Sequence, residues 1–102
     1  MPIEKAILVS IITESGLIPI IQDLLKRAGA TGYTIEPVVS GFGTHGCRDG
    51  QFEGDQTSKI ISLVSQTTAD KIFEEIEETL EPHYALTAFR HQVEALMPIV
   101  TS

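Results

Sequence analysis

The chain has 102 residues, of which 42% are hydrophobic and 21% charged, and its formal net charge is −7. This length and composition are typical of one globular domain, which we place at 1–102. The seven lysines and arginines form no stripe, which argues against a nucleic-acid surface. A single cysteine builds no disulfide framework, and no run reaches the ~20 apolar residues of a membrane span, so we expect a cytoplasmic protein.

The first strand and the first helix follow each other near the N-terminus. Ala6–Ile12 is a β-branched apolar run that predicts a central strand, and Thr13–Gly16 ends it. From Leu17 the apolar residues recur at helical spacing. Pro19 fits the first turn of this helix, and Gly29 fits the position just after its last turn.

Two further strands and a second helix are predicted downstream. Tyr33–Val39 reads as a strand, and its Pro37 indicates an edge position because proline cannot donate a ladder hydrogen bond. Lys59–Ser65 is the third strand. Thr67 and Asp70 then resemble a capping box at the start of the second helix. The apolar stripe of that helix consists of Ala69, Ile72, Phe73, Ile76 and Leu80.

The other side of the second helix is crowded with glutamates. We interpret these residues as a solvated surface, with a basic partner as the alternative. Pro82 ends the helix, and Tyr84–Leu96 is the fourth strand, with Arg90 on the face opposite Phe89.

The order β-α-β-β-α-β predicts an α+β, ferredoxin-like fold, in which a four-stranded antiparallel sheet carries both helices on one face. The other face of the sheet is then left uncovered by the chain's own helices. Because the strands are rich in isoleucine, leucine and valine, this face needs a partner, and we expect a closed homo-oligomer.

The long connection between the second and third strands contains Gly41–Gly54, which we call the glycine loop. Loops of this length are usually functional or disordered. Its five glycines allow close backbone approach to a ligand, and Arg48 offers a bidentate fork to a phosphate or carboxylate. It matches neither a Walker motif nor a dinucleotide fingerprint. The residues alone leave two alternatives open, an anion or nucleotide site and a flexible surface loop.

Two other chemistries, a metal site and a catalytic triad, have weaker support in the sequence. Cys47 with His45 suggests a metal site only if His83 and His91 converge on them, and a free thiol is the simpler interpretation. No histidine and acidic residue are evident as partners of Ser10, Ser40 or Ser62, so the sequence does not support a catalytic triad.

Two segments carry a resemblance to a known family. The turn Ala28–Ile35, with its sequence Ala-Gly-Ala-Thr-Gly-Tyr-Thr-Ile, resembles the corresponding segment of the PII signalling superfamily. The stretch Gly41–Gln51 is similar to the glycine- and arginine-bearing T-loop of PII-like proteins linked to bicarbonate uptake and carboxysomes. The resemblance implies a homotrimeric, non-enzymatic signalling protein with an adenine nucleotide in each cleft between subunits.

The resemblance also implies ligand-binding residues. Those expected to bind the nucleotide are Ile35, Gly41, Gly43, Thr44, Arg48, Tyr84, Ala85, Leu86 and Arg90. Those expected to contact bicarbonate or phosphate are His45, Gly46 and Arg48. For Arg90 a surface ion pair is an equal alternative. Ligand binding would order the T-loop and so regulate a partner, for which a bicarbonate transporter or a carboxysome component is expected.

The chain also departs from the family pattern. The uridylylated tyrosine of nitrogen-regulatory PII loops is missing, which disfavours nitrogen control. Glu81–Ala85 replaces a lysine-bearing phosphate loop, which favours AMP, ADP or cyclic AMP over ATP. The second arginine common in the bicarbonate-linked branch is missing near His45.

Two alternatives remain beside this hypothesis. One is a metal-binding trimer, similar in fold to the divalent-ion tolerance proteins, that uses Cys47 and His45. The other is an enzyme that hydrolyses nucleotides slowly, with Glu53 or Asp55 as general base.

Overall fold

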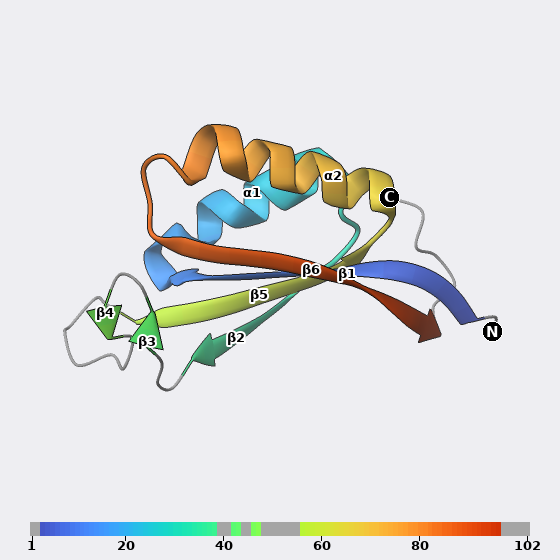
Figure 1. Ribbon diagram of the computed structural model, residues 1–102, viewed down its shortest axis with the longest axis horizontal. Coiled ribbons are helices and arrows are strands. Elements are labelled where there is room, and N and C mark those ends of the chain that lie inside the picture. Colours follow the sequence, from blue (N-terminus) through green and yellow to red (C-terminus); the bar gives the residue numbers. More distant parts are fainter. Residues whose placement is uncertain (1–2, 39–41, 44–45, 48–55, 97–102) are drawn as a thin grey trace.

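The computed structural model describes residues 3–38, 42–43, 46–47 and 56–96 of the chain. Its two layers are an antiparallel four-stranded sheet and a pair of helices that both lie on one face of the sheet (Figure 1). This is the ferredoxin-like α+β arrangement that the sequence predicts.

The main sheet has the strand order β2-β5-β1-β6, and all its neighbours are antiparallel. Its strands are β1 (Ile3–Glu14), β2 (Thr34–Val38), β5 (Thr57–Val64) and β6 (Leu86–Leu96). The central strand β1 is longer than the predicted Ala6–Ile12 at both ends, because it pairs with β6 out to Ile3, opposite Leu96, and with β5 as far as Glu14, opposite Thr57. Strand β2 lies at one edge, as Pro37 predicts.

The first helix begins and ends where Pro19 and Gly29 predict. A short 3₁₀ turn, η1 (Ser15–Leu17), leads into α1 (Ile18–Ala28), and Pro19 stands in the first turn. Gly29 ends the helix in the left-handed conformation, with φ at 107°, and its N–H donates to carbonyls of the last turn. A residue without a Cβ adopts this conformation without the steric cost that other residues meet.

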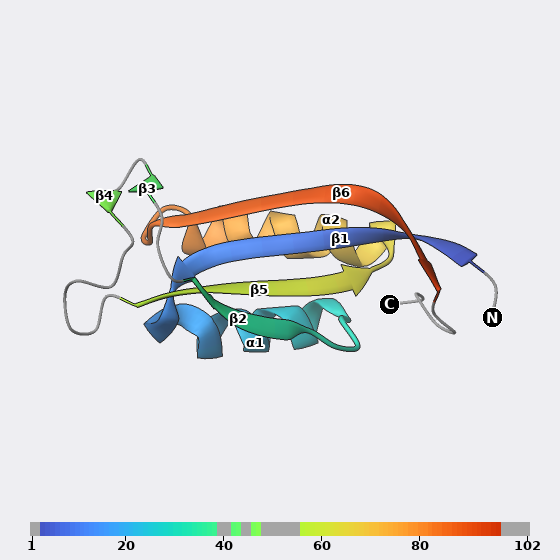
Figure 2. The ribbon, with the colours of Figure 1, turned by 90° about the horizontal axis from the view of Figure 1, so that it is seen from below.

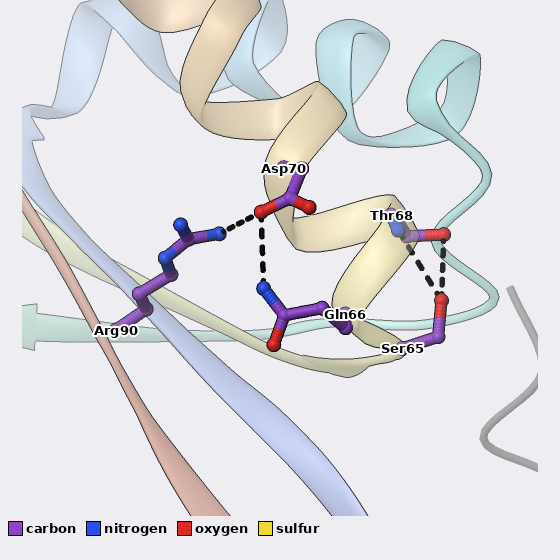
Figure 3. Close-up of polar contacts among 5 residues, drawn as sticks. All are labelled: Ser65, Gln66, Thr68, Asp70 and Arg90. Atoms are coloured by element: carbon purple, nitrogen blue, oxygen red, sulfur yellow. Dashed lines mark hydrogen bonds and ion pairs between the residues drawn. The ribbon is translucent and has the colours of Figure 1, made fainter.

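The second helix starts earlier than predicted. Helix α2 (Gln66–Glu75) continues into a π-helical turn, η2 (Ile76–Leu80), and its N-cap is Ser65. The Ser65 Oγ accepts from the Thr68 N–H at 3.2 Å, so the predicted capping box of Thr67 and Asp70 is wrong (Figure 3). A serine hydroxyl directly after β5 caps the helix first. The carboxylate of Asp70 instead accepts hydrogen bonds from other side chains.

The hydrophobic core lies between the sheet and the helices. The apolar stripes of both helices are buried there, as predicted, except Phe73, which is half-buried. Alternate residues of the inner strands complete the core, namely Ile7, Val9, Ile11, Ile60 and Val64. Within the described part of the chain, no helix is long and apolar enough to cross a bilayer.

The opposite face of the sheet is covered by no described helix (Figure 2), and we call it the open face. Strand register assigns to it the residues that alternate with the core, which include Leu8, Ser10, Ile12, Thr34, Glu36, Val38, Thr57, Lys59, Ile61, Leu63, Thr87, Phe89, His91 and Val93. Phe89 is 41% exposed here, so a large apolar side chain faces outward, as the sequence predicts for this side of the sheet.

Candidate functional site

The glycine loop leaves and rejoins the sheet at one end. Val38 and Thr57 form the last pair between β2 and β5, and the connection runs between them. The Ser15 N–H donates to the Gln56 carbonyl at 2.7 Å, and the hydroxyls of Ser15 and Ser58 lie 2.7 Å apart. These bonds attach the returning end of the loop to the turn between β1 and α1.

Part of the glycine loop is a short ladder. Strand β3 (Phe42–Gly43) pairs with β4 (Gly46–Cys47), and Gly43 lies directly opposite Gly46. Two predicted ligand residues therefore stand side by side, and their lack of Cβ atoms allows close backbone approach. The other predicted loop residues, Gly41, Thr44, His45 and Arg48, lie outside the described residues, and so do Glu53 and Asp55.

The turn between η2 and β6 lies at the same end of the sheet as the loop. The Thr13 hydroxyl donates to the Ala85 carbonyl at 3.2 Å, which joins this turn to the end of β1. Tyr84 is 40% exposed and meets the His83 ring edge-on, with 6.4 Å between ring centroids. Leu86 packs against the core. Of these predicted site residues, Tyr84 has the side chain most available to a ligand.

Predicted site residues on β2 and β6 do not meet within one chain. Ile35 lies on β2 at one edge of the sheet, whereas Leu86 begins β6 at the other edge and Tyr84 and Ala85 directly precede it. Strands β5 and β1 stand between them. The two groups of predicted residues therefore form no common site within one chain.

Arg90 is engaged by the second helix. Its Nη1 lies 2.8 Å from an Asp70 carboxylate oxygen, which also accepts from Gln66 at 3.1 Å (Figure 3). The guanidinium lies 4.9 Å from the Phe73 ring centroid. The hydrogen bond from Arg90 is the main cause that holds the pKa of Asp70 below its usual value. Of the two alternatives for Arg90, a ligand contact and a surface ion pair, the ion pair is the one formed in the single chain. It lies on the side of the sheet that carries the helices.

A hollow on the open face is a feature that the sequence interpretation did not assign. Its volume is about 230 Å³, and it is lined by Leu8, Thr31, Gly32, Tyr33, Thr34, Ile61, Ser62 and Leu63. Leu8, Ile61 and Leu63 form an apolar floor, and Thr31–Thr34 form a rim with hydroxyl and backbone groups. An apolar surface with a few polar groups suits a flat heterocycle, although this volume is below that of most complete ligand pockets.

Lys59 lies beside this hollow. It is the next open-face residue after Ile61 on β5, in the direction of the glycine loop. Its Nζ lies 5.9 Å from the Phe89 ring centroid. Of the lysines and arginines in the described ranges, Lys59 alone is assigned by register to the open face. The ammonium group itself is directed toward Phe89 on β6, away from the β2 edge of the hollow.

One signal in the sequence could have led to the hollow. Its rim lies inside the Ala28–Ile35 segment that carries the family resemblance, but the floor comes from β1 and β5. Only the sheet pairing brings these three segments together.

The metal alternative receives no support from the described residues. Across ranges 3–38, 42–43, 46–47 and 56–96, no three histidine, cysteine or acidic side chains gather at a metal-binding distance. His83 lies at the η2–β6 turn, whereas His91 lies on the open face opposite Leu8.

Comparison with known proteins places this fold and sequence in one family. The model of the nitrogen regulatory protein P-II family matches residues 6–101, so the chain belongs to that family. A search of curated proteins finds no match to the sequence.

Solved structures extend this comparison. A protein from Thermus thermophilus, provisionally described as a PII-like signaling protein, is 36% identical over 93% of both chains, with a TM-score of 0.79. CPII from Thiomonas intermedia, a nitrogen regulatory PII-like protein solved with ADP, AMP and bicarbonate, is 28% identical over 99% of this chain and 98% of its own, with a TM-score of 0.86. The GlnK–ATP complex of B. subtilis, at 18% identity over 87% of this chain and 82% of its own, shares the fold with a TM-score of 0.64.

Proposed function

We propose that this chain is a PII-like signalling protein whose residues 1–102 form one domain of a homotrimer. It is a regulator and not an enzyme, and it binds adenine nucleotides in the clefts between subunits. The observation that carries the proposal is the hollow on the open face, to which the described residues of one chain give a floor and one rim but no opposite wall. A neighbouring subunit would supply that wall.

The open face of the sheet supports the proposed oligomer. An open face with Phe89, Leu8 and Ile61 on it is an apolar surface of the kind that marks an interface. Ile35 and Tyr84 lie at opposite edges of the sheet. They would meet when the β2 edge of one subunit approaches the β6 edge of the next. Such a head-to-tail contact closes into a ring when the rotation permits.

Within this cleft we place the adenine base on the apolar floor of the hollow. The phosphate would extend along β5 past Lys59 to the glycine loop, where Arg48 and the amides of Gly43 and Gly46 would bind it. Gly41 and Thr44 would line the same wall, and Ile35, whose side chain register assigns to the helix side, would approach the ligand from the edge of β2. Tyr84, Ala85, Leu86 and Arg90 would come from the next subunit. Arg90 would have to exchange Asp70 for the ligand in order to take part.

The ligands we favour are AMP, ADP and cyclic AMP over ATP, with bicarbonate as a second ligand near His45, Gly46 and Arg48. CPII, which is 28% identical, was solved with ADP, AMP and bicarbonate, which supports the choice of these three ligands. The Glu81–Ala85 turn has no lysine to hold a third phosphate.

For the regulated process we propose inorganic-carbon uptake or fixation. Ligand binding would order the glycine loop, the T-loop of this fold, in the cytoplasm. The ordered loop would then engage or release a bicarbonate transporter or a carboxysome component. The bicarbonate in the CPII structure is the observation that favours carbon over nitrogen control.

Isothermal titration calorimetry with AMP, ADP, ATP and cyclic AMP, each with and without bicarbonate, tests the proposal. We expect heat from AMP, ADP and cyclic AMP, weaker binding of ATP, and a change in nucleotide affinity when bicarbonate is present. Limited proteolysis in the same samples should show protection of the glycine loop only where ligand binds. An absence of binding by all four nucleotides would refute the function, whereas nucleotide binding that bicarbonate leaves unchanged would refute the carbon assignment alone.

A further inference from the structure

The floor and the rim of the hollow belong to different parts of the fold. Leu8 and Leu63 of the floor are direct partners in the ladder between β1 and β5. The rim instead connects the end of α1 to β2. It begins after Ala30, whose N–H donates to the Leu25 carbonyl at 3.0 Å, and it enters the sheet at Thr34, which pairs with Ile61. The width of the hollow thus depends on how this connection is held.

Two side chains hold the rim from the side of the sheet that carries the helices. The Ser62 hydroxyl donates to the Gly32 carbonyl at 2.5 Å, and the Gln22 amide donates to the Tyr33 hydroxyl at 3.0 Å. Ser62 is only 3% exposed. It stands in β5 between Ile61 and Leu63, so its hydrogen bond joins the rim directly to the strand that forms the floor.

We propose that Ser62 is a positioning residue for ligand binding, which sets the distance between the rim and the floor of the hollow. The inference deepens the proposed function and rests on it for the identity of the ligand. The Ser62 hydroxyl points to Gly32 on the helix side and touches no ligand on the open face. Its effect is therefore indirect: when the donor is removed, the Gly32 carbonyl loses its partner, and the rim moves or fluctuates.

The test compares Ser62→Ala with the parent protein in two measurements, the affinity for ADP and the hydrogen exchange of backbone amides 31–33 without ligand. Ser62→Thr keeps the hydroxyl donor and serves as the conservative variant. Ile72→Val, a truncation under α2 far from the rim, controls for general loss of stability. Melting temperatures are measured for all variants.

We expect Ser62→Ala to exchange faster at 31–33 and to bind ADP about three- to tenfold more weakly, the range for one neutral hydrogen bond. Ser62→Thr should restore both properties, and Ile72→Val should change neither. Unchanged exchange and affinity in Ser62→Ala would overturn the inference, as would an equal effect of Ile72→Val. If the parent protein binds no adenine nucleotide, the proposed function fails, and the exchange of the rim alone then decides whether Ser62 positions it.

Discussion

Removal of the Lys59 ammonium group tests the binding of the phosphate separately from the binding of the adenosine part of the proposed ligand. In the single chain Lys59 contacts the Phe89 ring at 5.9 Å, an interaction worth about 0.5–1 kcal/mol at an exposed site. If the same ammonium binds a phosphate, each hydrogen bond to that charged group contributes roughly 1.5–3 kcal/mol. The effect of Lys59→Ala on binding should thus exceed its effect on stability.

We predict that Lys59→Ala weakens the binding of AMP and ADP about ten- to a hundredfold and lowers the melting temperature only slightly. Adenosine, which has no phosphate, should bind the variant and the parent equally, because the floor of the hollow is unchanged. Lys59→Arg should retain most of the nucleotide affinity. Lys71→Ala, a change on α2 across the sheet, should leave it unaltered.

Calorimetric titration of the four proteins with adenosine, AMP and ADP measures these differences. Equal losses for adenosine and ADP would mean that Lys59 shapes the hollow and binds no phosphate. Unaltered ADP affinity in Lys59→Ala would mean that the phosphate does not lie along the open face of β5. The proposed orientation of the bound nucleotide would then be wrong.

Three further predictions concern single positions. Arg48→Ala should keep the oligomeric state and melting temperature of the unliganded protein but lose nucleotide affinity about ten- to a hundredfold, together with the ligand's protection of the glycine loop; unchanged affinity would exclude the loop from the site. Because Arg90 lowers the pKa of folded Asp70, the pair stabilises the fold above the unfolded-state pKa and loses this contribution as the pH falls through the folded-state pKa. The melting temperatures of parent and Asp70→Asn should therefore converge in strong acid, and a gap independent of pH would contradict this reasoning. Gly29→Ala should destabilise the fold by about 1–2 kcal/mol in chemical denaturation, because φ is positive there, whereas Gly16→Ala, whose new Cβ meets open space, should have little effect.

The sequence predicted a helix or strand correctly where the residues that start and end it lie within the segment itself. Pro19 and Gly29 mark the two ends of α1, and both fulfil the predicted roles. The start of α2 was misjudged because Ser65 and Thr67 both suit an N-cap, and only the end of β5 decides between them. The periodicity of β6 correctly put Arg90 on the face opposite Phe89, since each strand residue alternates with the next.

The candidate site was less predictable, because it depends on contacts between distant segments. The rim of the hollow was visible as a glycine-bearing turn, but its floor depends on the pairing of Leu8 with Leu63. Likewise, the ion pair of Arg90 joins residues twenty positions apart, Asp70 on a helix and Arg90 on a strand, and strand periodicity does not name that partner. The opposite placement of Ile35 and Tyr84 follows only from the strand order of the sheet.

Native mass spectrometry during a titration with ADP tests the proposed nucleotide cleft between subunits, because it reports the oligomeric state and the number of ligands together. We predict a trimer that binds up to three ADP molecules, one for each cleft between neighbouring subunits. A monomer that binds ADP would place a complete site within one chain and contradict the proposed cleft. A trimer that binds no ADP would contradict the proposed nucleotide site.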